Sequence, residues 1–328
     1  MKDIYNRSID TLRISVTDRC NLRCTYCMPE KGIIPKSPDE ILSFEEIEKI
    51  VQILVPMGIT KVKITGGEPL VRKGIIHLVE KLAQIKGLCD ISMTTNGISI
   101  AKFARDLKNA GLSRINISLD SLNKDKFTSI TRGGDIRDVW LGIDEAFKVG
   151  LEPVKINVVL IKGINDDEIL DFARLTLNMP IHVRFIEFMP MLNGLFWDEE
   201  KFIPNDEVKE ECEILGKLSP ESNVLGSGPA AYYRLEGSKG SIGFISPLSH
   251  SFCNNCNRLR LTSDGRLRLC LHHENELNLK DMLRKGCRIE EIKKSIEKAV
   301  QDKPKRHNLC SGSRVFHYSN SAMSSIGG

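Results

Sequence analysis

Residues 12–27 read LRISVTDRCNLRCTYC, a β-branched run that is followed after two further residues by three closely spaced cysteines. Short runs of the same kind then alternate with longer amphipathic segments as far as residue 189. The predicted strands are Leu12–Thr17, Val62–Thr65, Ile91–Thr95, Ile115–Leu119, Val154–Ile161 and Ile181–Met189. Strands that are separated by helix-length segments are typical of βαβ units and a parallel sheet. Six such units predict an α/β fold with a barrel-like sheet.

The segments between these strands carry helix signals. Ser43-Phe44-Glu45-Glu46 has the pattern of a capping box and predicts a helix that ends near Gly58. The further helices that the apolar periodicity predicts are Ile75–Ile85, Ile100–Ala110, Val139–Val149 and Asp167–Leu177. They fit the crossover helices that parallel strands require.

The pattern changes beyond about Leu218, where Gly and Ser become frequent. The strands and the helix predicted in this part are Tyr232–Leu235, Ile242–Ile245, Leu259–Leu261, Leu267–Leu269 and Ile289–Val300. Asp264-Gly265 suits a tight hairpin turn between the last two strands. We therefore predict two parts, a barrel over residues 1–215 and a smaller α+β region over residues 216–328.

Composition excludes several classes of protein. The chain has 328 residues and a net charge of +4, so it is not a polycation built to bind nucleic acid. No stretch approaches the roughly 18 apolar residues of a membrane span, and Met1–Ile9 lacks the apolar core of a secretory signal. Ten cysteines in such a chain favour metal binding or redox chemistry in a reducing cytoplasm.

Cys20, Cys24 and Cys27 are spaced C-x3-C-x2-C. Three thiolates on one loop can hold three irons of a [4Fe–4S] cluster, which leaves the fourth iron open to a small molecule. A structural zinc site generally has four protein ligands, and this loop offers no fourth cysteine or histidine. The spacing therefore favours a cluster.

Cys253, Cys256 and Cys270 form a second trio, followed by His272 and His273. Either histidine could complete a Cys3His zinc site, so spacing alone leaves zinc and a second cluster equally open. The remaining cysteines, which follow no ligand spacing and are predicted to be buried thiols, are Cys89, Cys212, Cys287 and Cys310.

The segment Cys20-Asn21-Leu22-Arg23-Cys24-Thr25-Tyr26-Cys27 resembles the signature of radical S-adenosylmethionine (SAM) enzymes. The resemblance implies an open iron that chelates SAM and, when the cluster is reduced, cleavage of SAM to methionine and a 5′-deoxyadenosyl radical. That radical removes a hydrogen atom from the substrate. Thr65-Gly66-Gly67-Glu68-Pro69 is similar to the family's GGEP segment, which contacts the methionine end of SAM. The resemblance implies an incomplete parallel (βα)6 TIM-like barrel.

Further polar motifs end other predicted strands. These are Thr94-Thr95-Asn96-Gly97, Ser118-Leu119-Asp120 and Phe188-Met189-Pro190. Active sites of parallel barrels form at the carboxyl ends of the strands, so we expect these motifs on one rim with the first cysteine trio.

Residues 253–265, Cys270 and the ending Met323-Ser324-Ser325-Ile326-Gly327-Gly328 resemble the GTP 3′,8-cyclase family of molybdenum cofactor biosynthesis. The resemblance covers nearly the whole chain and moves the second trio toward a second [4Fe–4S] cluster, whose open iron binds the guanine of GTP. It implies removal of the ribose 3′ hydrogen, attack of C3′ on guanine C8, and the product 3′,8-cyclo-7,8-dihydro-GTP.

The resemblance also implies roles for individual residues. SAM contacts would involve Tyr26, Gly67, Glu68, Ser118 and Met189. GTP contacts would involve Arg13, Lys63, Thr94, Lys155, Arg258, Leu259 and Arg260. Catalysis would involve Arg13, Arg258, Arg260 and the tail residues Gly327 and Gly328. Basic side chains suit a triphosphate because they form charge-assisted hydrogen bonds. The family's double-glycine tail enters the active site, and glycines can pass through a narrow barrel mouth.

The expected partners are GTP, SAM, an electron donor and a second copy of the chain in a homodimer, with a functional link to the cyclic pyranopterin monophosphate synthase of the same pathway. We expect neither nucleic acid nor a membrane as a partner. Two alternatives remain: a radical SAM enzyme that modifies peptide or RNA, and a noncatalytic protein whose cysteines only hold loops together with zinc or a cluster.

Overall fold

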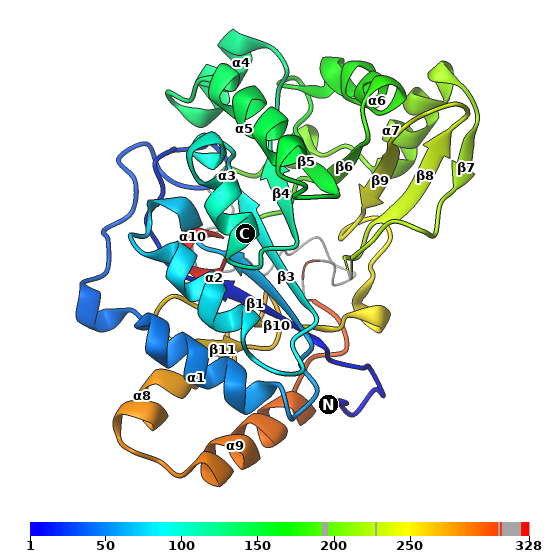
Figure 1. The fold of residues 1–328 in the computed structure, drawn as a ribbon. Coiled ribbons are helices and arrows are strands. Elements are labelled where there is room, and N and C mark those ends of the chain that lie inside the picture. The colour runs from blue at the N-terminus through cyan, green and yellow to red at the C-terminus, as the bar shows by residue number, and fades with distance from the viewer. Residues whose placement is uncertain (192–195, 227, 308, 310–322, 328) are drawn as a thin grey trace.

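The computed structural model describes residues 1–191, 196–226, 228–307, 309 and 323–327. Its centre is one sheet of twelve strands in the order β12-β11-β10-β1-β2-β3-β4-β5-β6-β9-β8-β7 (Figure 1). The six barrel strands, all parallel to their neighbours, are β1 (Thr11–Ser15), β2 (Lys61–Thr65), β3 (Asp90–Thr95), β4 (Arg114–Ser118), β5 (Val154–Leu160) and β6 (Ile181–Glu187). The predicted incomplete (βα)6 barrel is confirmed.

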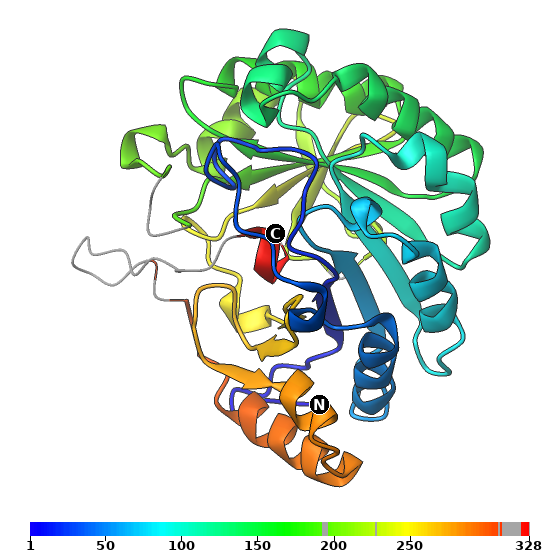
Figure 2. The same ribbon diagram turned by 90° about the vertical axis from the view of Figure 1, so that its left-hand side faces the viewer.

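Helices cover the outer face of the curved sheet (Figure 2). Those between the barrel strands are α1 (Phe44–Leu54), α2 (Ile75–Ala83), α3 (Ile100–Asn109), α4 (Lys124–Thr131), α5 (Ile136–Lys148) and α6 (Ile169–Asn178). The capping box is confirmed, because Glu46 N–H donates to Ser43 Oγ at 3.1 Å and Ser43 N–H donates to the Glu46 carboxylate at 2.8 Å. Helix α1 ends four residues before Gly58, at Leu54.

The second part of the chain extends the barrel sheet at both edges. Strand β9 pairs in parallel with β6, and β10 pairs in parallel with β1. The elements of this part are α7 (Asn205–Cys212), β7 (Leu218–Pro220), β8 (Ala231–Leu235), β9 (Ser241–Ile245), β10 (Arg258–Leu261), β11 (Arg266–Arg268), β12 (Glu276–Asn278), α8 (Leu279–Arg284), α9 (Ile289–Gln301) and α10 (Met323–Ile326). Strands from both sides of residue 215 therefore share one sheet, and the division at that residue stays a prediction.

The predicted hairpin joins β10 to β11. The two strands are antiparallel, and Gly265 in the turn between them has φ +82°, a conformation that glycine adopts without strain. None of the described helices is long and apolar enough to cross a membrane.

Alternation along the barrel strands places apolar and charged side chains on opposite faces. In β1, Leu12 and Ile14 are fully buried in the hydrophobic core. Arg13 lies between them and faces the interior of the barrel, because successive side chains of a strand point to opposite sides. Lys63 has the same relation to Val62 and Ile64 in β2. The barrel therefore buries its apolar side chains under the helices and turns charged ones inward.

Candidate active site

A cavity of about 310 Å³ lies inside the barrel, and all six cysteines of the two trios are among the residues that line it. The first trio follows the carboxyl end of β1. The second trio lies at the opposite end of the barrel, because Cys256 precedes β10, which is parallel to β1, and Cys270 follows the antiparallel β11. The cavity therefore connects the two cysteine sites through the barrel.

The first cysteine loop is supported by α4, a helix between two barrel strands that the sequence did not predict. Arg23 N–H donates to Thr131 O at 3.0 Å, and Thr25 N–H donates to Ile130 O at 2.9 Å. The guanidinium of Arg23 also donates to Cys20 O at 2.6 Å. The last turn of α4 thus fixes the main chain that carries the trio.

The first trio fits a cluster by its chemistry. The three thiols form no disulfide, and each is half-buried on the cavity wall. Burial raises the pKa of Cys27 to about 12, with a further contribution from the charges of Cys20 and Asp120. Such a thiol stays protonated near neutral pH until a metal ion binds the sulfur and displaces the proton into solvent. The arrangement can therefore hold the three protein-bound irons of a [4Fe–4S] cluster.

The Gly66-Gly67-Glu68 segment lies directly against this loop. A Cβ atom on Gly67 would lie 2.3 Å from Arg19 O, and Gly67 N–H donates to Thr17 O at 2.7 Å. The glycines are therefore required by the approach of two main chains. Glu68 is 1% exposed, and its carboxylate accepts hydrogen bonds from Leu70 N–H, Thr95 Oγ1 and Asn96 N–H, at 3.1, 2.8 and 2.7 Å.

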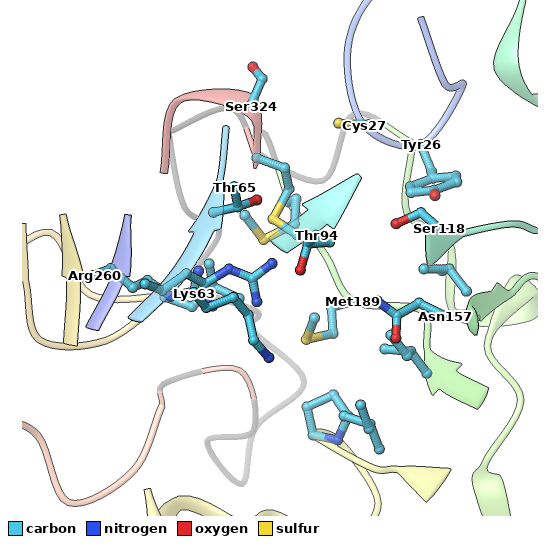
Figure 3. Close-up of a pocket in the computed structure, with 18 of the residues that line it drawn as sticks. Tyr26, Cys27, Lys63, Thr65, Thr94, Ser118, Asn157, Met189, Arg260 and Ser324 are labelled. Carbon is cyan, nitrogen blue, oxygen red and sulfur yellow. The ribbon is translucent and has the colours of Figure 1, made fainter. Parts of the chain in front are cut away.

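Tyr26, Ser118 and Met189, three predicted SAM contacts, all reach the cavity (Figure 3). Tyr26 Oη donates to Asp120 Oδ2 at 2.5 Å, and Asp120 Oδ1 accepts from Val159 N–H at 2.8 Å. Burial raises the pKa of Asp120 to about 6. Asp120 therefore ties the aromatic residue of the cysteine motif to the ends of β4 and β5.

The charged groups around the second trio are positive, whereas carboxylates lie near the first trio. Burial raises the pKa of Cys256, but the positive charges of Lys303 and Arg258 outweigh it and lower that pKa to about 7. His272 lines the cavity, is 8% exposed and has no hydrogen-bond partner at Nδ1 among the described residues, whereas His273 Nε2 lies 3.2 Å from Arg306 O. Among the described residues, no three His, Cys, Asp or Glu side chains converge as ligands of a single ion.

The wall between the two trios is cationic. Arg13, Lys63, Arg258 and Arg260 line the cavity, and none forms an ion pair with a described carboxylate. Burial, together with the neighbouring guanidinium groups, lowers the pKa of Lys63 and lowers that of Arg260 to about 10. Arg13 Nε is buried and has no hydrogen-bond partner in the part of the chain that the structure describes. Uncompensated buried cations of this kind fit an anionic ligand with several charges.

The C-terminal tail also enters the barrel. Helix α10 lies inside the curve of the sheet (Figure 2), where Ser15 Oγ donates to Ser324 O at 3.3 Å and the Arg260 guanidinium donates to Gly327 O. Gly327 has φ +75°, and a Cβ atom there would lie 2.5 Å from Thr65 Cγ2. A residue with a side chain therefore does not fit this position without displacing its surroundings. Gly328 lies outside the described residues.

Comparisons with known proteins agree with this geometry. The Radical SAM superfamily model matches residues 14–176, and the Molybdenum Cofactor Synthesis C model matches residues 181–309. A GTP 3′,8-cyclase from Thermodesulfovibrio yellowstonii is 56% identical over 93% of this chain and 94% of its own length. Another from Alkaliphilus metalliredigens is 50% identical over the full length of both chains. The chain belongs to the GTP 3′,8-cyclase family.

A solved structure extends the comparison of folds. Streptococcus suis SuiB bound to S-adenosylmethionine has a TM-score of 0.63 to this chain at 15% sequence identity. The match covers 92% of this chain and 73% of SuiB. At this identity the likeness concerns the fold alone.

Three residues expected to bind ligands in this family member lie away from the cavity wall. Lys155 points toward the amino end of the barrel, where its Nζ donates to Leu225 O and lies 5.1 Å from the centre of the Tyr232 ring. Leu259 is fully buried in the core, so only its main chain is near Arg258 and Arg260. Glu68 binds the neighbouring loops, as described above, and does not line the cavity. Gly67 and Thr94 do line it.

The residues that sequence reasoning missed are Arg184 and Asn157, which line the cavity from β6 and β5. Arg184 donates to Asn116 Oδ1 at 2.7 Å, and no described residue is a hydrogen-bond partner of its Nε. The sequence did contain a pattern that could have predicted Arg184, because this residue interrupts an apolar strand as Lys63 does. Among the remaining cysteines, Cys212 is buried and Cys287 is half-buried, but the prediction of a buried thiol was wrong for Cys89, which is exposed. Cys310 lies outside the described residues.

Proposed function

We propose that this chain is a radical SAM GTP 3′,8-cyclase, which converts GTP to (8S)-3′,8-cyclo-7,8-dihydroguanosine 5′-triphosphate in the first step of molybdenum cofactor biosynthesis. The observation that carries the proposal is the single cavity that both cysteine trios line, with a wall of basic side chains between them. One end suits SAM and the other suits a nucleotide. The names of the full-length relatives agree with this reaction.

Cys20, Cys24 and Cys27 would hold the first [4Fe–4S] cluster, which, when bound and reduced, would supply the electron for cleavage of SAM. Tyr26, held by Asp120, fixes the aromatic residue of this loop beside the cavity. Gly67, Ser118 and Met189 offer SAM a wall at the carboxyl ends of β2, β4 and β6, and Glu68 holds the loops behind them.

Cys253, Cys256 and Cys270 would hold the second cluster, and the guanine would then bind at the amino end of the barrel. Arg13, Lys63 and Thr94 then lie along the nucleotide, with Arg258 and Arg260 beside the second trio. Their charge neutralises the triphosphate. Lys155 Nζ donates a hydrogen bond to Leu225 O in this structure, and this bond must break before Lys155 can contact a phosphate.

The tail completes the site. Arg260 donates to Gly327 O, so one side chain both faces the cavity and fixes the tail in the barrel. With Arg13 and Arg258, the tail glycines hold the ribose so that its 3′ hydrogen meets the radical and C3′ then reaches C8. Uptake of one electron and one proton gives a product with the composition of GTP.

Anaerobic incubation of the reconstituted protein with GTP, SAM and dithionite tests the proposal, with mass analysis of the nucleotide. We expect an isomer of GTP and one 5′-deoxyadenosine per turnover. Deuterium placed at C3′ of GTP is expected to appear in the 5′-deoxyadenosine. Deoxyadenosine that carries no label would show that hydrogen is taken from another position, and the assignment to this reaction would fail.

The proposal includes partners and a compartment. A donor of single electrons is required by the reaction, and the expected compartment is the cytoplasm, where thiols stay reduced. From the family we also infer a homodimer and a functional link to cyclic pyranopterin monophosphate synthase. Sedimentation of the protein at micromolar concentration tests the dimer, and a single species with the mass of one chain would contradict it.

A further inference from the structure

Lys303, two residues after α9, is the most deeply buried lysine near the second trio. It is 2% exposed, and its Nζ donates to Arg258 O at 3.0 Å and also to Leu269 O. Arg258 follows Cys256 by two residues, and Leu269 directly precedes Cys270. The ammonium group therefore links the main chain just after Cys256 to the main chain just before Cys270. Lys303 itself lies 33 positions beyond Cys270 in the sequence.

A buried ammonium normally has a carboxylate partner, because an isolated charge in a protein interior is costly. No described Asp or Glu forms an ion pair with Lys303. The groups that favour its positive charge are the sulfurs of Cys256 and Cys270, whereas Arg7 and Arg258 oppose it. Burial disfavours the charged ammonium, and the cysteine sulfurs oppose that cost only in part.

Arg7 fastens Lys303 to this position. Arg7 is 6% exposed and forms an ion pair with Asp3 at 2.6 Å. Its guanidinium donates to Cys253 O at 2.9 Å, to Pro304 O at 2.8 Å and to Lys305 O at 3.2 Å. The N-terminal segment thus links Cys253, the remaining cysteine of the trio, to the main chain beside Lys303.

We propose that Lys303 is the counter-ion of the second cysteine trio and a positioning residue for the cluster bound there. Three thiolates give the cluster site a negative charge, and each added electron increases it. A fixed positive charge stabilises the reduced state more than the oxidised state, so it raises the midpoint potential. This inference rests on the proposed second cluster.

The test isolates the second cluster in the full-length chain. In a parent variant with Cys20, Cys24 and Cys27 replaced by Ala, only the second trio can bind a cluster. Lys303→Gln keeps a hydrogen-bond donor for the two carbonyls but loses the charge, and Lys303→Arg keeps both. Lys305→Gln removes an exposed lysine of the same segment and is the matched control. Iron content and a potentiometric titration followed by electron paramagnetic resonance are measured for each.

We expect Lys303→Gln to lower the midpoint potential, so that the ratio of reduced to oxidised cluster at a fixed potential falls at least tenfold, which is about 59 mV for one electron. Lys303→Arg and Lys305→Gln should stay within threefold of the parent. Loss of iron in Lys303→Gln but not in Lys303→Arg also supports a need for charge. An unchanged potential in Lys303→Gln, or loss of iron in both Lys303 variants, would overturn the inference.

The outcomes also separate this inference from the proposed function. A parent variant that binds no iron at the second trio would refute the second cluster itself, before any Lys303 variant is compared. A parent that binds the cluster, with variants that do not shift its potential, would refute only the role of Lys303.

Discussion

The two cysteine trios use the same three ligands in opposite electrostatic surroundings. At the carboxyl end of the barrel, burial raises the pKa of Cys20 and Cys24, and the charges of Glu68 and Asp120 raise it further. At the amino end, the pKa of Cys256 is lowered to about 7, because Lys303 and Arg258 outweigh the effect of burial. The two sites therefore differ in the charge of their surroundings although each has three cysteines.

The difference matches the charges of the two ligands. SAM carries a sulfonium cation, and the carboxylates of Glu68 and Asp120 lie near the trio that we propose binds it. GTP carries a polyanionic triphosphate, and Arg13, Lys63 and Arg260 lie between the other trio and the middle of the barrel. Opposite charges lower the cost of placing each ligand in a buried site. In the proposed function, each ligand therefore binds at the end of the cavity whose charges oppose its own.

The largest effect is expected from removing one cysteine of each trio. Cys24→Ala should abolish SAM cleavage, because the first cluster loses a ligand. Cys256→Ala should abolish cyclisation while SAM cleavage continues in the absence of product. Iron content, 5′-deoxyadenosine and cyclised nucleotide are measured for both variants. Equal loss of SAM cleavage in both, with the other cluster retained in each, would contradict the division of roles.

The cationic wall gives the next largest effect. Arg258→Ala and Arg260→Ala should each weaken GTP binding about ten- to a hundredfold, since a charge-assisted hydrogen bond contributes roughly 1.5–3 kcal/mol. Arg266→Ala is the control, because Arg266 lies on the neighbouring β11, is exposed and pairs with Asp264. GTP affinity is measured by isothermal titration with both clusters present. Equal affinity in all three variants would remove these arginines from the nucleotide site.

The comparison of the two ends also shows how much the sequence could predict. The first trio and its rim were predictable, since a strand, a three-cysteine loop and the Gly66-Gly67 turn are local patterns. Helix α4 was missed because its buried face consists of only Phe127, Ile130 and Thr131, too few for a clear apolar period. Its role in holding the cysteine loop depends on main-chain bonds that no side-chain pattern records.

The surroundings of the second trio were less predictable for a different reason. Strand β10 is a neighbour of β1 although more than 240 residues separate them in the sequence, so no local pattern places Arg260 beside Arg13. Arg7 and Lys303 come from opposite ends of the chain and read as ordinary surface charges in sequence. Only the fold shows that both are buried.

The C-terminal tail lies in the barrel between the two cysteine sites. We expect substitution there to have a smaller effect than substitution of the cysteines or arginines. Gly327→Ala should lower cyclisation at least tenfold, because φ is +75° and the added Cβ would lie 2.5 Å from Thr65 Cγ2. Gly286→Ala is a control with a similar φ of +72° and nothing within 4 Å of the added Cβ, so it carries the backbone strain without the clash. Cluster content and GTP affinity should stay unchanged in both. Full cyclisation by Gly327→Ala would show that the tail does not act in the site.

The smallest expected effect is on the pH dependence of ligand affinity, which should have opposite directions for GTP and SAM. Burial, with Arg184 and Arg114 nearby, lowers the pKa of Lys155 to about 7. A bound triphosphate favours the charged form and raises this pKa, so GTP binding should take up a proton above pH 7. GTP affinity should therefore be highest below pH 7 and fall several-fold between pH 7 and pH 8.5.

Lys155→Arg should flatten this dependence, because arginine stays charged throughout the range, whereas Lys162→Arg, a change at an exposed site, should leave it as it is. SAM affinity should not fall over the same range. Burial raises the pKa of Glu68 to about 7 and that of Asp120 to about 6, so both carboxylates gain negative charge as pH rises and favour the sulfonium. Parallel titrations of the two ligands in buffers of different ionisation enthalpy measure both trends. A common pH dependence for GTP and SAM would mean that the charges at the two ends do not select their ligands.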